Sequence, residues 1–122
     1  MKRIHVIEDE DALREALVTH LTNAGYEVEG VFTTEDGLLQ AVENPPDLIL
    51  LDVLTRSLHG SVFLEQLREE SNPAKDVPVI VLTNIEDDAI KQKILAYGVK
   101  EYFIKAHVTL AEILDAIKKL GI

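Results

Sequence analysis

Acidic, hydroxyl and amine side chains in this sequence each stand directly after a short apolar run. These side chains are Glu8, Asp9, Asp52, Thr83 and Lys105. Carboxylates can hold a hard cation such as Mg²⁺, a lysine can bind a phosphate oxygen as a point charge, and a hydroxyl can hydrogen-bond another phosphate oxygen. A carboxylate can also be a nucleophile that forms an acyl phosphate. If folding brings these groups together, cation and amine would offset the charge on a transferring phosphoryl group.

Asp52 is the most informative of these residues. It ends a run of four apolar residues, 48–51, that follows Pro45–Pro46. Such a run predicts a strand that is buried on both faces, as in a parallel sheet. A buried strand has no structural need for a terminal acid. We therefore expect Asp52 at the mouth of the sheet, where open α/β folds bind their ligands.

Two hydrophobic periodicities alternate along the chain. Short apolar or alternating runs predict strands at 4–7, 26–32, 48–51, 77–82 and 99–104. Helical spacing predicts a helix after each strand, ending near Gly25, Asn44, Asn72–Pro73, Gly98 and Leu120, with Thr33 or Thr34 and Thr109 as caps. This order predicts an α/β fold with a five-stranded parallel sheet and helices on both faces. The length of 122 residues fits one domain over 1–122.

Each candidate also has an ordinary structural alternative. Asp9 or Asp11 could cap the first helix, Thr83 could be a strand residue or a cap, and Lys105 could be solvated. These alternatives do not explain why all the residue types meet at one edge of the sheet, as the carboxyl ends of parallel strands must.

Composition excludes several classes of function. There are 12 basic and 22 acidic residues, a net charge of −10, so nucleic-acid phosphates would be repelled and we expect no direct nucleic-acid binding by this domain. The chain has no cysteine, which excludes disulfides and thiolate metal sites and suits the cytoplasm. The first apolar run is too short for a signal peptide or a membrane span. The four histidines lack metal-ligand spacing, and we expect them at the surface or partly packed: His5, His20, His59 and His107.

The chain resembles the receiver domain of two-component response regulators, the fold of the single-domain chemotaxis regulators. The resemblance covers essentially the whole chain. It rests on Glu8–Asp9, on Asp52 with Gly60 eight residues later, on Thr83, and on Tyr102 three residues before Lys105. It implies a flavodoxin-like sheet with strand order 2-1-3-4-5.

The resemblance also implies a role for each site residue. Asp52 is expected to be the phospho-acceptor. Asp9 would bind Mg²⁺ directly, with Glu8 helping through water and the backbone carbonyl of Leu54 completing the protein's ligands. Thr83 would swing toward the phosphoryl group, Lys105 would pair with it, and Tyr102 would turn inward on activation.

Partners follow from the same resemblance. The phosphodonor would be a sensor histidine kinase, a phosphotransfer protein or a small phosphodonor. A downstream protein would bind the face made by the fourth helix, fifth strand and fifth helix, and a homodimer could form there. The domain would catalyse only its own phosphorylation and dephosphorylation.

Several positions depart from the family pattern. Ala106 replaces a proline that usually has a cis peptide bond, so this bond is either trans or strained. Arg56 stands where the family often has proline, and Asn84 stands where a small residue is usual, which would slow or tune phosphorylation. Leu54 and Ile85 are both apolar. We expect these two to shield the acyl phosphate from water and lengthen the life of the phosphorylated state.

Three other readings remain open at this point. The chain could be a pseudo-receiver that is never phosphorylated and acts through protein contacts. This alternative stays open because Ala106 and Asn84 depart from the family pattern. A flavin or nucleotide protein is disfavoured because the acidic run 8–11 is a poor phosphate cradle and no glycine-rich loop is present. A hydrolase that uses the same acids and metal is a third alternative, but the single domain offers neither a cap nor an obvious substrate pocket.

Overall fold

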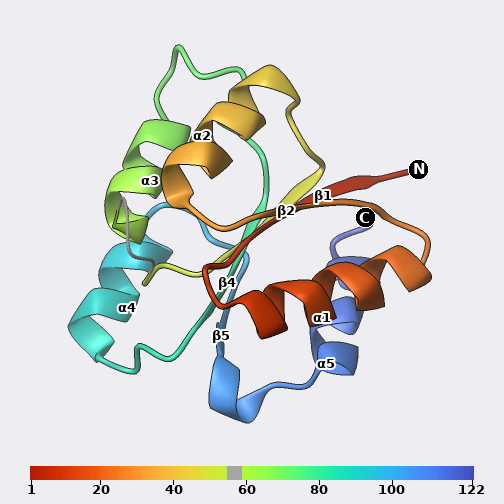
Figure 1. The fold of residues 1–122 in the computed structure, drawn as a ribbon. Helices are drawn as coiled ribbons and strands as arrows, with labels where there is room; N and C mark the ends of the chain where they lie inside the picture. The colour runs from red at the N-terminus through yellow and green to blue at the C-terminus, as the bar shows by residue number, and fades with distance from the viewer. Residues whose placement is uncertain (55–58) are drawn as a thin grey trace.

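Five parallel strands form one sheet in the order β2-β1-β3-β4-β5 (Figure 1), as predicted. The structure is a computed structural model and describes residues 1–54 and 59–122. Its strands are β1 (Arg3–Ile7), β2 (Glu27–Val31), β3 (Leu48–Leu51), β4 (Val79–Thr83) and β5 (Glu101–Ile104). Its helices are α1 (Asp11–Asn23), α2 (Thr34–Glu43), α3 (Gly60–Leu67), α4 (Asp88–Leu95) and α5 (Leu110–Lys119), with a short 3₁₀ turn, η1 (Lys105–His107).

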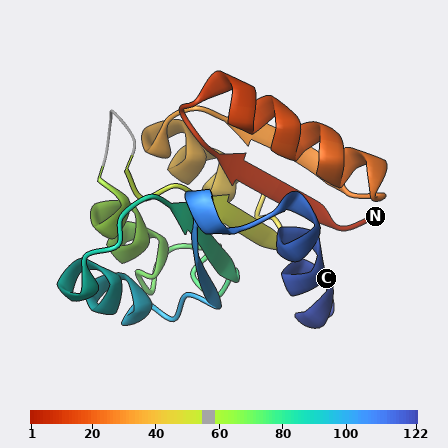
Figure 2. The same ribbon diagram turned by 90° about the horizontal axis from the view of Figure 1, so that it is seen from below.

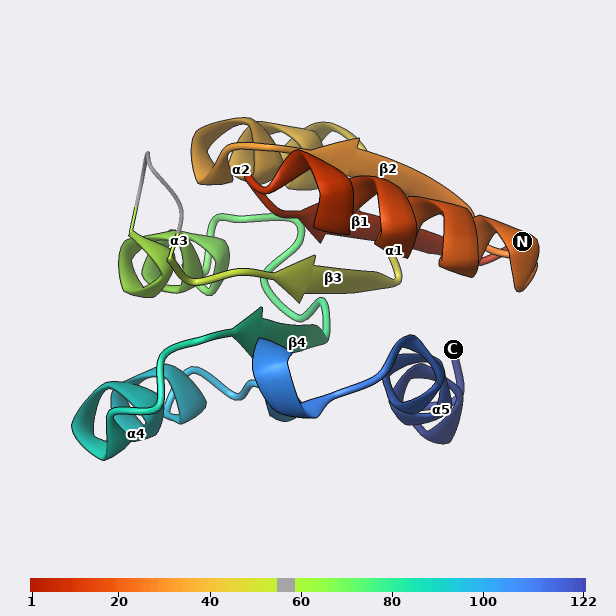
Figure 3. The same cartoon turned by 60° about the horizontal axis from the view of Figure 1, so that its bottom comes forward.

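The sheet is covered on both faces (Figures 2 and 3). Alternate residues of β3 point to opposite faces, so Leu48 and Leu50 pack against α1 and α5, whereas Ile49 and Leu51 pack against α2, α3 and α4. All four are at most 2% exposed. This double burial explains why the strand is a continuous apolar run rather than an alternating one.

The third helix ends earlier than the sequence predicts. We expected it to run to Asn72–Pro73, but α3 ends at Leu67. Its C-cap residue, Arg68, is drawn into tertiary contacts and donates hydrogen bonds to the carbonyls of Lys75, Val77 and Tyr97 at 2.8, 2.6 and 3.0 Å. These bonds turn the chain toward β4, and no local propensity reveals them.

Three of the strands are shorter than predicted. The strand expected at 77–82 is β4, Val79–Thr83. Proline at position 78 has no N–H for the ladder, although its carbonyl accepts a bond from the Ile49 amide at 3.0 Å. The strands expected at 26–32 and 99–104 narrow to β2 and β5.

Helix starts show which local predictions were correct. Thr33 and Thr109 cap α2 and α5 with their side chains, as expected, and Thr109 forms a capping box with Glu112. The proposed capping of α1 by Asp9 or Asp11 is wrong, because Glu10 is the N-cap residue and no side-chain hydrogen bond caps that end. An ordinary capping role therefore does not account for the acids after β1.

His5 is a further correction. It was expected at the surface or partly packed, but it lies in β1 with 1% of its surface exposed. It shares the sheet face with Ile7 because the two are separated by one residue. Burial, together with the positive charge of Arg3, lowers the pKa of its imidazole.

Among the described residues, no helix combines the length and the apolar character that a membrane crossing requires.

Candidate functional site

Four strands deliver their polar end residues to one edge of the sheet. Glu8 and Asp9 follow β1, Asp52 follows β3, Thr83 ends β4, and Lys105 follows β5. Because all the strands are parallel, these positions meet although Asp52 and Lys105 are 53 positions apart. The structure thus brings together four of the residues that the sequence selected, Glu8, Asp9, Asp52 and Lys105. It places the fifth, Thr83, at the end of β4, the strand next to β3.

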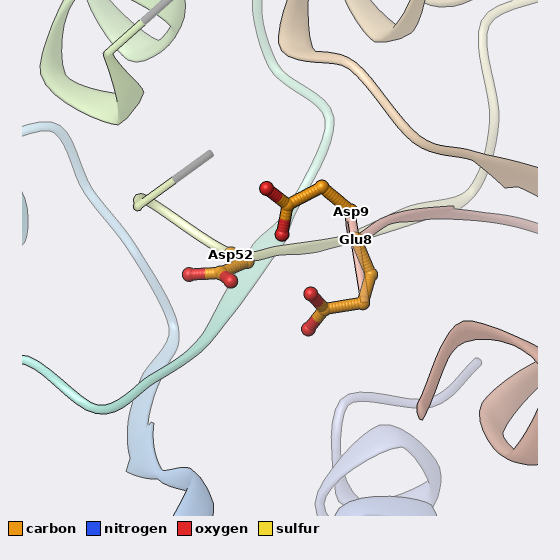
Figure 4. A group of neighbouring side chains, drawn as sticks. All are labelled: Glu8, Asp9 and Asp52. Atoms are coloured by element: carbon orange, nitrogen blue, oxygen red, sulfur yellow. The ribbon is translucent and has the colours of Figure 1, made fainter. Parts of the chain in front are cut away.

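Three carboxylates converge at this edge (Figure 4). One oxygen from each of Glu8, Asp9 and Asp52 lies within 4.8 Å of the others. The backbone fixes two of these residues through the ladder, since the Asp52 amide donates to the Ile7 carbonyl at 3.0 Å and the Glu8 amide donates to the Val31 carbonyl at 2.9 Å. Glu8 is 2% exposed and Asp52 is 4% exposed, so their charges are poorly solvated.

Lys105 bridges two of the carboxylates. Its Nζ lies 2.7 Å from Glu8 Oε1 and 2.9 Å from Asp52 Oδ2. Among the described residues no peptide bond is cis, so the bond to Ala106 is trans. The missing proline therefore does not prevent the lysine from reaching Asp52.

Burial and ion pairing shape the ionisation of this pair. Burial raises the pKa of the Glu8 carboxyl, and the negative charge of Asp52 adds to this, against the opposing hydrogen bonds from Lys105 and the Glu10 amide. Burial alone would lower the pKa of the Lys105 ammonium, but the hydrogen bonds to Glu8 and Asp52 and the negative charges of these two carboxylates together outweigh burial and raise it. Lys105 therefore stays cationic and offsets the repulsion between the acids.

The glycine that stands eight residues after Asp52, Gly60, has a clear physical reason. An added Cβ would lie 2.4 Å from both Cα and Cβ of Val53, which is too close for any side chain. Its amide also donates to the Val53 carbonyl at 3.0 Å. Only glycine lets α3 begin directly against the residue that follows Asp52.

A hydrogen-bonded path leads from Thr83 to Tyr102. The Thr83 side chain is fully buried, and its Oγ1 accepts a long, 3.4 Å bond from the Ile85 amide. The Tyr102 hydroxyl donates to the Ile85 carbonyl at 2.8 Å. One peptide segment thus connects the hydroxyl at the site to an aromatic ring of β5.

The positions expected to alter the rate of phosphorylation or the lifetime of the phosphorylated state lie around the site as follows. Leu54 is 57% exposed, and its amide donates to Asp52 Oδ1 at 2.9 Å. Asn84 is exposed, whereas Ile85 is half-buried against the core. Arg56 lies outside the described residues.

The donor set fits a magnesium ion. Glu8, Asp9 and Asp52 supply only carboxylate oxygens, and among the residues that the structure describes no nitrogen or sulfur ligand joins the cluster. Mg²⁺ prefers such hard oxygen donors and usually keeps several waters. The partial exposure of Asp9 leaves a side from which water can approach.

Two residues near the site were not predicted. Glu10 Oε2 lies 4.0 Å from Lys105 Nζ, and the Arg14 guanidinium donates to the Glu8 carbonyl at 2.9 Å. The acidic run at 8–11 signalled Glu10. Arg14 lies one helical turn after it, a spacing that could have indicated contact with the preceding loop.

Comparison with known proteins agrees with this geometry. The family model described as the response regulator receiver domain matches residues 4–118. The chain is 36% identical over 107 residues to a probable transcriptional regulator, ycf27, of Cyanidium caldarium, with 85% of this chain and 41% of the relative covered. It is 31% identical over 105 residues to the response regulator ArlR of Staphylococcus aureus, with 86% of this chain and 46% of the relative covered.

Solved structures share the whole fold. The chemotaxis protein CheY4 of Vibrio cholerae has a TM-score of 0.87 and 25% identity, with 98% of each chain covered. The response regulator TrrA of Thermotoga maritima, solved in complex with Mg²⁺-BeF, has a TM-score of 0.83 and 28% identity, with 98% of this chain and 99% of that chain covered.

Fold, site and relatives define a signalling domain of two-component systems rather than a conventional enzyme. The chain belongs to the response regulator receiver domain family. It spans less than half the length of the curated relatives named above.

Proposed function

We propose that Asp52 accepts a phosphoryl group in a Mg²⁺-dependent reaction, and that residues 1–122 act as one receiver domain. The observation that carries this proposal is the buried Asp52 carboxylate, paired with Lys105 at 2.9 Å and clustered with Glu8 and Asp9. The nearest structural alternative, a strand residue without a task, does not explain three carboxylates and an ammonium held together with so little solvent.

The transfer begins with attack by an Asp52 oxygen on the phosphorus of a phosphohistidine. A P–O bond forms, the P–N bond breaks, and its electron pair returns to the imidazole of the donor. Lys105 pairs with an oxygen of the transferred group, and the Thr83 hydroxyl donates a hydrogen bond to another. The signal ends by hydrolysis: water attacks the phosphorus, the P–O bond to Asp52 breaks, and inorganic phosphate leaves. Both are reactions of the domain on itself.

Glu8, Asp9, Asp52 and the Leu54 carbonyl would hold the Mg²⁺. When bound, the ion supplies positive charge beside the phosphoryl oxygens. Glu8 has a second task in this proposal, because its bond to Lys105 holds the ammonium at the site. The similar protein solved with Mg²⁺-BeF supports the choice of cation.

The output of phosphorylation would travel through the path from Thr83 to Tyr102. When the Thr83 hydroxyl turns to the phosphoryl group and releases the Ile85 amide, the backbone at Ile85 can shift, and the Tyr102 hydroxyl is hydrogen-bonded to the carbonyl of that same residue. Tyr102 lies in β5 beside α4, so its rotation would change the face made by α4, β5 and α5. A downstream protein, or a second copy of the chain in a homodimer, would bind that face.

The donor would be a sensor histidine kinase or a phosphotransfer protein, and the domain would act in the cytoplasm. A pseudo-receiver is not favoured, because Lys105 reaches Asp52 despite Ala106.

Incubation with Mg²⁺ and acetyl phosphate, read by intact mass, tests the proposal. We expect the addition of one phosphoryl group, its loss in Asp52→Ala, and its retention in Asp115→Ala, which changes an exposed acid of α5. A protein that gains no phosphoryl group from acetyl phosphate or from a panel of phosphorylated histidine kinases would contradict phosphorylation and favour the pseudo-receiver.

A further inference from the structure

The Arg14 guanidinium contacts the backbone of the loop that carries the acids Glu8 and Asp9. It donates from one nitrogen to the Glu8 backbone carbonyl at 2.9 Å and from another to Asp11 Oδ1 at 2.6 Å. Its side chain is only 17% exposed, although α1 is a surface helix. A long cationic side chain at the surface usually stays solvated, so these contacts need an explanation.

Two residues of the neighbouring strand and loop form a cradle for this side chain. A Cβ added to Gly30 would lie at a tight 3.1 Å from Val18 Cγ2 and in ordinary van der Waals contact, at 3.4 and 3.5 Å, with Cγ and Cδ of Arg14, so the arginine stem runs directly beside this glycine. The Phe32 ring is 59% exposed, and its centroid lies 5.6 Å from the Arg14 Cζ. A glycine inside a strand weakens that strand, and the Phe32 ring lies within cation–π distance of the guanidinium. Both features have a purpose if Arg14 must be held in place.

The held atom belongs to the peptide that carries the acids. Glu8 is the first residue beyond β1, and among the described contacts its carbonyl accepts only from Arg14. The Glu8 amide is tied to β2 through the Val31 carbonyl. The segment is therefore fixed from the strand side by β2 and from the helix side by Arg14, and the side chains of Glu8 and Asp9 leave from it toward Asp52 (Figure 4).

We propose that Arg14 is a positioning residue that locks the Glu8–Asp9 backbone so that both carboxylates face the cation site. The mechanical part of this inference concerns the metal-free protein, and its effect on Mg²⁺ rests on the proposed function. Outer partners of metal ligands commonly change metal affinity by about 10–100-fold.

If Arg14 acted only through its charge, its removal would change the Mg²⁺ affinity in the opposite direction. Arg14 is a cation close to an acidic cluster, so its positive charge repels Mg²⁺, and its removal would tighten binding if it acted only through space. Removal of a positioning residue instead loosens the Glu8–Asp9 backbone and weakens binding. The direction of the change therefore separates the two roles.

The experiment compares wild type with Arg14→Met, Arg14→Lys, Gly30→Val and Arg3→Met. Calorimetric titration with Mg²⁺ measures affinity, and NMR hydrogen exchange in the metal-free protein measures protection of the Glu8 and Glu10 amides. Gly30→Val keeps the guanidinium charge but adds a branched side chain beside the Arg14 stem. Arg3→Met is the matched control, because Arg3 has a weak 3.7 Å pair with Glu27 at the opposite end of β1.

We expect Arg14→Met to weaken Mg²⁺ binding by roughly tenfold and to speed exchange of the Glu8 amide by about tenfold or more. Gly30→Val should shift both readouts in the same direction, Arg14→Lys should recover part of each, and Arg3→Met should change neither. Unchanged exchange, or tighter Mg²⁺ binding in Arg14→Met, would overturn the inference. A wild type that binds no Mg²⁺ would instead refute the metal part of the proposed function, and the exchange measurement would still decide whether Arg14 locks the backbone.

Discussion

Replacing Lys105 by methionine removes the cation that holds the acidic site together in the metal-free protein. The Lys105 Nζ lies 2.7 Å from a carboxylate that is 2% exposed and 2.9 Å from one whose side chain is 5% exposed. Breaking a buried ion pair by removing one partner costs about 3–5 kcal/mol, because the other charge stays buried without compensation. We therefore expect Lys105→Met to lower the free energy of unfolding by about 3 kcal/mol.

The chain contains a matched control for this variant. Lys75 and Glu70 form a pair at the same 2.9 Å distance, but their side chains are 36% and 94% exposed. An exposed pair contributes only about 0–1 kcal/mol. Lys75→Met should thus have a small effect, although the distance and the chemical change are identical.

Urea unfolding followed by circular dichroism is the assay, since the chain has no tryptophan. It should be run in chelator and again with Mg²⁺. Mg²⁺ at 100 times its dissociation constant stabilises a protein by about 2.7 kcal/mol, and we expect a larger gain in Lys105→Met, whose carboxylates have lost their other cation. Equal losses for Lys105→Met and Lys75→Met in chelator would refute the reasoning, because the site would then behave as a solvated surface.

Three other predictions follow from the described contacts. Leu54→Asn combined with Ile85→Glu should speed loss of the phosphoryl group, because polar side chains would no longer keep water from the acyl phosphate; an unchanged decay rate of the phosphorylated protein would refute this shielding. The pKa of His5 is lowered in the folded state, chiefly by burial, so the unfolded chain binds the proton first as pH falls below about 6.5. Wild type should therefore lose stability relative to His5→Val between pH 7 and pH 5 in urea titrations, and a constant difference between the two proteins would contradict this prediction. Arg68→Met should cost about 2–4 kcal/mol, because three carbonyls lose a charged donor; a loss below about 0.5 kcal/mol would be the loss expected at an ordinary surface position.

Local patterns were most reliable where one physical effect dominated. The apolar run of β3 left no alternative to a buried strand, and its bounds were predicted correctly at 48–51. The capping box at Thr109 depends on residues three apart, so neighbours in sequence suffice to predict it. The predicted end of α3 was wrong because Arg68 donates hydrogen bonds to carbonyls up to 29 positions away in the sequence.

The sequence by itself determined which residue types end each strand, because hydrophobic periodicity locates strands and parallel strands share one edge. This was enough to select Glu8, Asp9, Asp52, Thr83 and Lys105 and to propose their chemistry. Their assignment as phospho-acceptor, metal ligands and switch stays a prediction for the experiments above.

Only the tertiary structure decided how these residues meet. Contacts such as Lys105 to Asp52 and Tyr102 to the Ile85 carbonyl depend on how the strands align and the helices pack across the sheet. Such contacts join segments that have no local signal for one another, since side-chain direction and burial are fixed by packing rather than by sequence spacing. The burial that makes the Lys105 bridge matter exists only once both layers of helices have closed over the sheet.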